Sequence, residues 1–174
     1  MKKLFVLEGP DCSGKSTLAR ALQKKTNGVI FHASGNKLLW PVMHEYHQSI
    51  IDNAFAVLEH HDVIIDRLWL SELVYHRVLR PHLERRYQWE LLDAQIRGKQ
   101  GLYITCYPDP GIYARYEKNI DPSHPYDMKT FKRICTGYLI EFTTMHSRND
   151  RFEYSVNFYN NSVDLAVKQI LTLW

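Results

Sequence analysis

The chain has 174 residues, of which 45% are apolar and 24% are charged, and its formal net charge is +3. This length and composition are typical of a single globular domain over residues 1–174, with a charge that suits an anionic ligand but is too small to indicate a nucleic-acid-binding surface. No apolar run approaches the roughly 20 residues that span a bilayer, the first residues lack the form of a signal peptide, and the three cysteines are widely spaced, which predicts a cytoplasmic location without membrane contact.

The first predicted elements are a strand at residues 3–8, a glycine-rich turn at residues 9–17 and a helix at residues 18–25. The turn reads Gly-Pro-Asp-Cys-Ser-Gly-Lys-Ser-Thr and matches the phosphate-binding pattern G-x-x-x-x-G-K-[ST] at every fixed position. Gly9 and Gly14 allow backbone angles that a side chain would forbid, so the N–H groups of the loop can converge on one anion at the helix N-terminus. The alternative is a chance glycine-rich turn, but a strand before the pattern and a helix after it are the context that phosphate binding requires.

Several side chains of this loop have a predicted place at bound ATP. Lys15 can reach the outer phosphates, and Ser16 can place its hydroxyl on Mg²⁺. Asp11 would be repelled by a triphosphate, so we expect it to face a hydroxyl of the second substrate; the alternative is a bond to backbone N–H groups of the loop itself. The residues predicted to form the ATP site are Gly9, Asp11, Cys12, Ser13, Gly14, Lys15, Ser16 and Thr17.

Strands and helices alternate along the rest of the chain. Further strands are predicted at residues 28–32, 62–67, 102–107 and 152–159. Further helices are predicted at residues 41–60, 68–80, 81–98, 108–118, 128–147 and 163–173. This alternation predicts an α/β three-layer sandwich, in which a five-stranded parallel sheet carries helices on both faces. Ligands of such sheets bind beyond the carboxyl ends of the strands, where the phosphate loop, residues 32–36 and the pair Asp66-Arg67 would meet.

Asp66 and Arg67 close the third predicted strand. Asp66 can hold a water of Mg²⁺ or orient the attacking oxygen, and Arg67 can grip an acceptor phosphate through two N–H groups. The alternative is a surface ion pair at a strand end, which would contribute little to stability. We predict that both residues are catalytic, together with Lys15 and Arg115.

A group of cations surrounds a polar, turn-rich segment at residues 119–127. We predict a lid at approximately residues 115–129, which closes over the transferring phosphoryl group and excludes water; the alternative is a solvated helix face. No side chain of the phosphate loop before Lys15 is cationic, so the second positive group that the transition state needs is expected from this lid. The candidates, in order of preference, are Arg115, Lys118, Lys129 and Arg133.

These motifs resemble those of the thymidylate-kinase-like nucleoside monophosphate kinases. The resemblance rests on residues 5–11, on residues 14–17, and on Asp66-Arg67 followed by Ser71 and Tyr75, and the order and length of the chain agree over essentially all of it. It implies ATP and Mg²⁺ as phosphoryl donor and metal, a P-loop NTPase fold with a five-stranded parallel sheet, and a lid.

The resemblance also implies roles for individual residues. Asp11 would contact the sugar 3′-hydroxyl, Arg67 the acceptor phosphate and Tyr75 the sugar region, with Ser71 also in the substrate site. Adenine of ATP would lie near Asn160 and Asn161. The sequence departs from the family pattern at Cys12, where members often have Arg or Gly, at His76, where a Gln often stands, and at residues 32–36, which replace a Thr-Arg-Glu-Pro-Gly segment. The last two departures affect acceptor recognition, so the acceptor base is left open.

The leading interpretation is ATP-dependent phosphoryl transfer to a deoxynucleoside monophosphate, which gives a deoxynucleoside diphosphate and ADP. A second interpretation is a kinase with the same donor site that phosphorylates a hydroxyl of a nucleoside or of a modified base in DNA, with Asp66 as base. A third is a nucleotide-binding switch without turnover, against which the intact Lys15, Ser16 and Asp66 count. The expected partners are a small-molecule nucleotide, nucleic acid only in the second interpretation, and a second copy of the chain in a homodimer.

Overall fold

The computed structural model describes residues 1–35, 37–83, 87–119, 126–146, 153–156 and 162–173. Its centre is a sheet with strand order β2-β3-β1-β4-β5, and each neighbouring pair of strands is parallel. The strands are β1 (Leu4–Glu8), β2 (Val29–His32), β3 (Val63–Asp66), β4 (Leu102–Cys106) and β5 (Glu153–Val156). The five-stranded parallel sheet predicted from the sequence is therefore confirmed.

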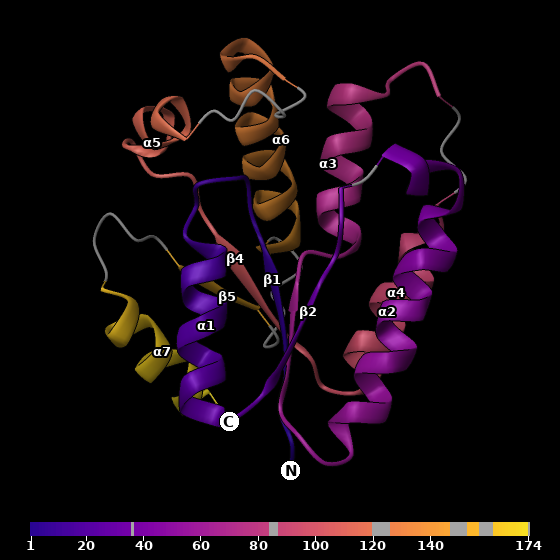
Figure 1. Ribbon diagram of the computed structural model, residues 1–174, viewed down its shortest axis with the longest axis vertical. Coiled ribbons are helices and arrows are strands. Elements are labelled where there is room, and N and C mark those ends of the chain that lie inside the picture. The colour runs from indigo at the N-terminus through magenta and orange to yellow at the C-terminus, as the bar shows by residue number, and fades with distance from the viewer. Residues whose placement is uncertain (36, 84–86, 120–125, 147–152, 157–161, 174) are drawn as a thin grey trace.

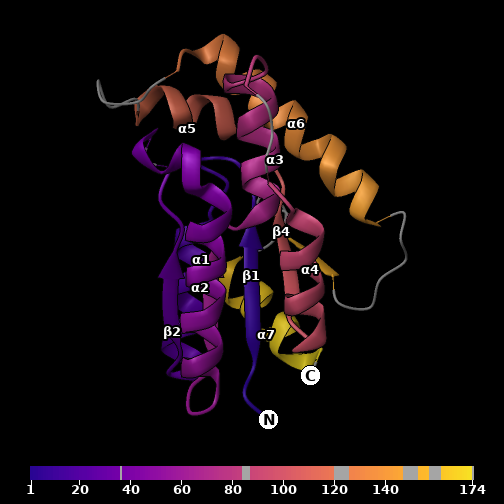
Figure 2. The ribbon, with the colours of Figure 1, turned by 90° about the vertical axis from the view of Figure 1, so that its right-hand side faces the viewer.

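Helices cover both faces of this sheet (Figures 1 and 2). On one face, α1 (Lys15–Thr26) and α7 (Val163–Thr172) pack against Phe5 and Leu7 of β1. On the other face, Leu4 and Val6 meet a larger group of helices. These are α2 (Met43–Leu58), α3 (Trp69–Leu79), α4 (Trp89–Gly98) and α6 (Met128–His146). Successive side chains of a strand point to opposite faces, so the all-apolar stretch of β1 has a core on each side.

The remaining α-helix, α5 (Ile112–Lys118), lies past the carboxyl ends of the strands beside one end of α6 (Figure 1). It is held there by a small cluster in which the rings of Tyr116 and Phe131 stack 3.7 Å apart. In the described part of the chain, no helix is both long enough and apolar enough to cross a membrane.

Some predicted helix boundaries are wrong, and tertiary contacts explain the largest difference. The helix expected over residues 81–98 begins only at Trp89. Before it, Tyr87 is buried against His47 of α2, and the Trp89 ring stacks on Trp69 of α3 at 4.7 Å. These contacts hold Tyr87 against α2 and Trp89 against α3 at the start of the observed helix, and residues 84–86 of the expected helix lie outside the described residues.

The other two late helix starts have local causes. The helix expected from residue 41 begins at Met43, because Pro41 belongs to the preceding 3-10 segment η1 (Lys37–Val42). The helix expected from residue 108 begins at Ile112, because the Asp109 carboxylate accepts a bond from the Gly111 N–H at 2.7 Å and holds a turn there.

The parallel register brings polar chain ends together at one edge of the sheet. Leu7 and His32 both lie opposite Asp66, and Glu8 lies opposite Thr105. The segments that follow β1, β2 and β3 therefore start side by side, as the sequence predicts.

Gly9 is the tightest point of this edge. Its φ is 154°, and a Cβ placed there would lie 2.4 Å from the Cys106 carbonyl oxygen. We expect Gly9→Ala to lower the free energy of unfolding by about 3 kcal/mol, because the closest atom is a backbone carbonyl oxygen, which cannot move aside as a flexible side chain can. Gly98→Ala is the matched control: a Cβ there meets nothing within 4 Å, so the change should be neutral or stabilising by about 0.5 kcal/mol. Urea unfolding of the three proteins measures both effects, and equal stability of the two variants would contradict the prediction.

Candidate active site

The loop between β1 and α1 forms an anion-binding turn. Cys12 and Gly14 both have left-handed backbone angles, with φ of 60° and 87°, and α1 begins directly after Gly14. The loop borders a cavity of about 300 Å³, which is lined by Cys12, Ser13, Gly14, Lys15, Ser16, Thr17, Arg115 and Asn119. A helix N-terminus with converging N–H groups favours negative charge, so this cavity suits phosphate oxygens.

Lys15 places a cation on the floor of the loop. Its side chain is 5% exposed, and its Nζ donates a 2.6 Å hydrogen bond to the Pro10 carbonyl oxygen. Burial, followed by the nearby positive charge of Arg67, lowers the pKa of Lys15 to about 8. The amine is therefore still mostly protonated at neutral pH and can attract an anion.

Ser16 and Asp66 form a group of oxygens that fits Mg²⁺. Ser16 Oγ donates to Asp66 Oδ2 at 3.3 Å, and His32 Nδ1 lies 3.2 Å from the same oxygen. Asp66 Oδ1 is buried, and no hydrogen-bond partner for it is found in the part of the chain that the structure describes. Burial alone would raise the pKa of Asp66, but the bond to His32 and the charge of Lys15 hold it below its usual value.

An ionised carboxylate with one unused oxygen beside a hydroxyl is an arrangement that can hold Mg²⁺ or one of its waters. The described ranges contain no cluster of three or more His, Cys, Asp or Glu side chains placed for a metal. A few protein oxygens completed by phosphate and water are what Mg²⁺ ordinarily uses, so the fit is to Mg²⁺ carried by a nucleotide.

Arg115 of α5 reaches the phosphate loop. Its Nε donates to the Cys12 carbonyl oxygen at 3.1 Å, and its two terminal nitrogens contact the Asp109 carboxylate at 3.1 and 2.5 Å. Asp109 is itself buried, and the Arg115 hydrogen bond lowers its pKa although burial alone would raise it. These contacts hold the Arg115 guanidinium at the loop. Because the side chain is still 44% exposed, the guanidinium can also contact a ligand.

The other lid candidates are placed differently. Lys118, Lys129 and Arg133 are exposed on α5 and α6, and no contact of theirs with the phosphate loop is seen among the described residues. Residues 120–125, the middle of the predicted lid, lie outside the described residues, as do Asn160 and Asn161.

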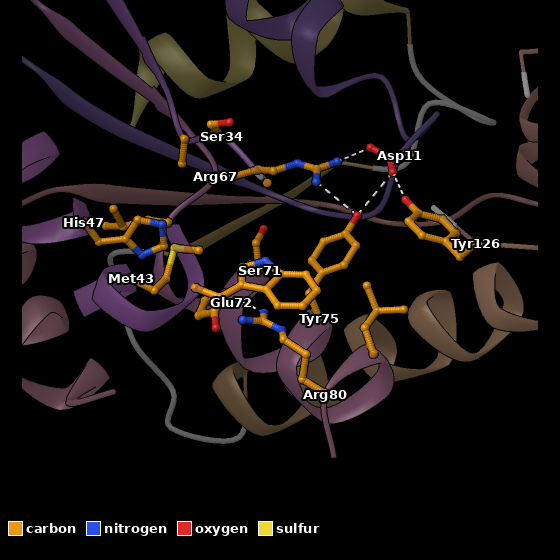
Figure 3. A pocket seen from close by; sticks show the side chains of 15 residues that line it. Asp11, Ser34, Met43, His47, Arg67, Ser71, Glu72, Tyr75, Arg80 and Tyr126 are labelled. Atoms are coloured by element: carbon orange, nitrogen blue, oxygen red, sulfur yellow. Dashed lines mark hydrogen bonds and ion pairs between the residues drawn. The ribbon is translucent and has the colours of Figure 1, made fainter. Parts of the chain in front are cut away.

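A second, larger cavity of about 440 Å³ lies on the other side of the loop, between α2, α3 and Tyr126 (Figure 3). Asp11 and Arg67 line it from the loop side, and the remaining walls come from the segment after β2, from η1, α2 and α3, and from Tyr126. The lining residues are Asp11, Ala33, Ser34, Gly35, Trp40, Met43, His47, Arg67, Leu68, Ser71, Glu72, Tyr75, Leu79, Arg80 and Tyr126.

Asp11 and Arg67 form an ion pair at the mouth of this cavity. Arg67 Nη1 also donates to the Tyr75 hydroxyl at 3.0 Å, and the hydroxyls of Tyr75 and Tyr126 both donate to Asp11 Oδ2 (Figure 3). Burial opposes charge on Asp11, but Arg67 and Lys15 hold its pKa well below the usual range. The structure thus brings the predicted residues Asp11, Arg67 and Tyr75 together around one carboxylate.

Arg67 adopts a left-handed backbone conformation, with φ of 73°. Its N–H donates to the Leu7 carbonyl at 2.9 Å, which continues the pairing of β1 and β3 past Asp66. A non-glycine residue held in this region is costly and is found mainly at functional sites. The unusual angles send the guanidinium toward the phosphate loop.

Ser71 lines the cavity, but its hydroxyl is engaged within the protein. It donates to Glu8 Oε2 at 2.5 Å and accepts from the Tyr138 hydroxyl at 2.6 Å. Glu8 Oε1 accepts from the N–H groups of Leu68 and Leu70, so this carboxylate caps the start of α3. The hydroxyl predicted to bind substrate therefore helps to position α3.

Glu8 and several cavity residues were not among the sites predicted from the sequence. Two features of the sequence could have indicated these residues. Glu8 is an acid at the carboxyl end of a buried strand, the same position that drew attention to Asp66. On α3, residues at helical spacing from Ser71 and Tyr75 share their face, which extends the cavity wall to Leu79. The overlooked lining residues with polar or aromatic side chains are Trp40, His47, Glu72, Arg80 and Tyr126.

One curated relative matches part of the chain. It is the SPβ prophage-derived protein YorR of Bacillus subtilis strain 168, which is 29% identical over 111 residues. The match covers 63% of this chain and 64% of YorR, so it spans less than two thirds of that protein. No known protein-family model matches the chain.

Solved structures match over nearly the whole chain. YorR of Bacillus subtilis in complex with phosphorylated GDP has a TM-score of 0.71 and 26% identity, over 98% of this chain and 95% of YorR. Thymidylate kinase from Candida albicans has a TM-score of 0.61 and 15% identity, over 99% and 90% of the two chains. Deoxyadenosine kinase from M. mycoides with bound dATP has a TM-score of 0.59 and 14% identity, over 99% and 98%. The chain therefore has the P-loop fold of these kinases, and the predicted resemblance to the thymidylate-kinase-like proteins is confirmed at the level of the fold.

The buried Glu8 makes a testable contribution to stability. Burial is the main reason that the pKa of Glu8 rises from 4.5 to about 7. The folded protein then binds a proton that the unfolded chain releases, so the contribution of Glu8 is full below pH 4.5 and is lost as the pH rises toward 7. Glu8→Gln removes this dependence. We expect the stability of the wild type relative to Glu8→Gln to fall by about 2 kcal/mol between pH 5 and pH 8.

Urea unfolding of both proteins at several pH values measures the difference. Glu59→Gln, at an exposed glutamate at the end of α2, is the control and should show no such trend. A relative stability that rises with pH would mean that Glu8 is preferentially ionised in the folded protein.

Proposed function

We propose that this protein is a nucleoside monophosphate kinase, which transfers the terminal phosphoryl group of ATP to a deoxynucleoside monophosphate. The observation that carries the proposal is the pair of cavities on either side of the phosphate loop. Cys12 and the residues after it line the smaller cavity, and Asp11 lines the larger one. A donor phosphate and an acceptor phosphate held in these two spaces would meet at the loop, which is the arrangement that direct phosphoryl transfer needs.

Each proposed role follows from a side chain's position. The loop N–H groups and Lys15 would bind the donor phosphates, and Ser16 and Asp66 would hold Mg²⁺, which when bound neutralises charge on the phosphate oxygens. Arg67 would bind the acceptor phosphate, because its guanidinium lies between the loop and the larger cavity. Asp11, next to Arg67, would accept a bond from the acceptor's sugar hydroxyl.

Arg115 is the proposed transition-state cation. It is fixed at the loop by Asp109 and by the Cys12 carbonyl, opposite the side on which Arg67 lies. Two guanidinium groups and one ammonium around the transferring group would offset the charge that spreads over its oxygens. The lid around residues 115–129 would close over this point and exclude water.

The comparisons support a nucleotide ligand. YorR, a structural relative with 26% identity, was solved with phosphorylated GDP. The thymidylate kinase and deoxyadenosine kinase folds support phosphoryl transfer as the reaction class, with a small-molecule nucleotide as partner.

A second candidate is phosphorylation of a nucleoside hydroxyl. The observation that favours it is that Arg67 is already paired with Asp11, so a ligand phosphate would have to compete for that guanidinium. The structures of deoxyadenosine kinase match the fold about as well as thymidylate kinase does. A nucleoside would fit the larger cavity, and Asp66 would then act as the base.

Substitution of Arg67 separates the two candidates. Arg67→Lys keeps the charge but loses the two-pronged contact, so it should weaken the affinity for a deoxynucleoside monophosphate about tenfold or more and leave ATP affinity nearly unchanged. Phosphoryl transfer from labelled ATP, tested on a panel of deoxynucleosides and their monophosphates, gives the kcat and KM values, and calorimetry gives the ATP affinity. Lys15→Ala is the inactive reference. Transfer to nucleosides but not to monophosphates would replace the first candidate with the second.

Removal of Arg115 tests the transition-state role. We expect Arg115→Ala to lower kcat by about a hundredfold or more with little change in ATP affinity, because the contact would strengthen mainly in the transition state. Lys118→Ala, on the same helix but exposed, is the matched control and should keep nearly normal kcat. If both variants turn over normally, another lid cation such as Lys129 or Arg133 must supply the charge.

A further inference from the structure

The end of the larger cavity away from the phosphate loop holds a second charged pair. Arg80 Nη2 donates to Glu72 Oε2 at 2.8 Å, and the two side chains are only 4% and 7% exposed. Figure 3 shows Glu72 and Arg80 together on one side of the cavity, away from the network of Asp11 and Tyr126. A buried ion pair seldom stabilises a fold more than apolar side chains of the same size would, so its presence in a cavity wall suggests another role.

This pair has hydrogen-bonding capacity that the protein does not use. Arg80 Nε is buried and has no hydrogen-bond partner among the described residues, although unpaired buried donors are costly. The guanidinium is held in place by the Trp40 ring, with its carbon 4.4 Å from the ring centroid. Each carboxylate oxygen of Glu72 can accept about two hydrogen bonds, so Oε2 can accept another beside that from Arg80, and Oε1, which has His76 Nδ1 4.0 Å away, can accept one as well.

Another polar group that lines this cavity is His47, and it adds no charge. Burial is the main reason that the pKa of His47 falls to about 4, so the ring is neutral at pH 7. Its Nδ1 is engaged with the Tyr87 hydroxyl. Glu72 and Arg80 are therefore the charged groups of this end of the cavity, and Met43 and Leu79 supply apolar walls beside them.

We propose that Glu72 and Arg80 read the base of the acceptor and select guanine. A carboxylate only accepts hydrogen bonds and a guanidinium only donates them. Guanine has two adjacent donors, N1–H and N2–H, which match the two carboxylate oxygens of Glu72. It also has the acceptors O6 and N7, to which an arginine donates in the commonest specific contact with this base. This assignment rests on the proposed function for the acceptor site and specifies its substrate.

The other bases satisfy the pair less well. Thymine has a single donor, N3–H, between two carbonyl acceptors, so one carbonyl would face the Glu72 carboxylate. Adenine and cytosine each have one amino group next to a ring-nitrogen acceptor, which leaves one carboxylate oxygen without a partner. Sites built to hydrogen-bond a polar group discriminate strongly against ligands that lack it, because buried groups are then left unpaired. The expected order of affinity is guanine first and thymine last.

Ligand analogues test this assignment without any change to the protein. Calorimetry of the wild type with the 5′-monophosphates of deoxyguanosine, deoxyinosine, deoxyadenosine, deoxycytidine and thymidine gives five affinities. Deoxyinosine monophosphate differs from the guanine nucleotide only by the missing N2 amino group. We expect it to bind about tenfold more weakly, which corresponds to the loss of one hydrogen bond to a charged acceptor.

The variant Glu72→Gln identifies the residue responsible. Glutamine keeps one acceptor oxygen and replaces the other with an NH2 donor, so if Glu72 accepts both N1–H and N2–H of guanine, the preference for the guanine nucleotide over the inosine nucleotide should fall severalfold in Glu72→Gln. Glu59→Gln, an exposed control outside the cavity, should keep the wild-type ratio. Circular dichroism and thermal unfolding establish that the variants are folded.

The outcomes distinguish this inference from the proposed function. If monophosphates bind and are phosphorylated but another base is preferred, the guanine assignment is wrong and the kinase proposal stands. If only nucleosides bind, with guanine first and the ratio dependent on Glu72, the base assignment stands and the monophosphate acceptor is wrong. If the wild type binds the guanine and inosine compounds equally, or binds neither the monophosphates nor the corresponding nucleosides, the assignment is overturned.

Discussion

The contact between Asp11 and Arg67 organises this site, because it ties the phosphate loop to the neighbouring strand. Arg67 continues the pairing of β3 with β1 through its N–H, and its left-handed backbone directs the guanidinium back to the loop. The phosphate loop leaves the sheet between the two cavities, with Asp11 facing one and the backbone of Cys12 facing the other. Together with the hydrogen bonds from the Tyr75 and Tyr126 hydroxyls to Asp11, this ion pair holds the loop in place beside the larger cavity.

Charge is distributed so that cations remain available at the loop. Lys15 and Arg67 are buried close together, and Asp11 and Asp66 stay ionised beside them. Glu8, one residue before the loop, is the exception, since burial raises its pKa and leaves it partly protonated near neutral pH. A neutral or weakly charged Glu8 does not compete for Lys15, and its oxygens serve the N–H groups at the start of α3 instead.

Helix α3 connects the two ends of the larger cavity. Its first turn is anchored by Glu8 and carries Glu72, its middle carries Tyr75 at the Asp11 network, and Arg80, directly after its last residue, donates back to Glu72. A rigid helix sets the separation between the phosphate-binding end and the end that we assign to the base. A nucleotide of the right length can therefore meet both ends, and base recognition is coupled to the position of the phosphate.

The sequence by itself determined the phosphate loop and the α/β fold, because both depend on local patterns. The glycine spacing at residues 9–17 predicts a phosphate-binding loop when a strand precedes it and a helix follows it. Apolar strands that alternate with helices specify a parallel sheet, and Asp11, Asp66 and Arg67 come together at the carboxyl ends of its strands. Only the tertiary structure decided how α3 is used. The bond of Ser71 to Glu8, the late start of α4 at Trp89 and the pairing of Glu72 with Arg80 depend on contacts between segments whose side-chain directions no local pattern specifies. Periodicity indicates which face of a helix is buried, but it does not indicate which buried polar atom meets a partner and which is left to meet a ligand.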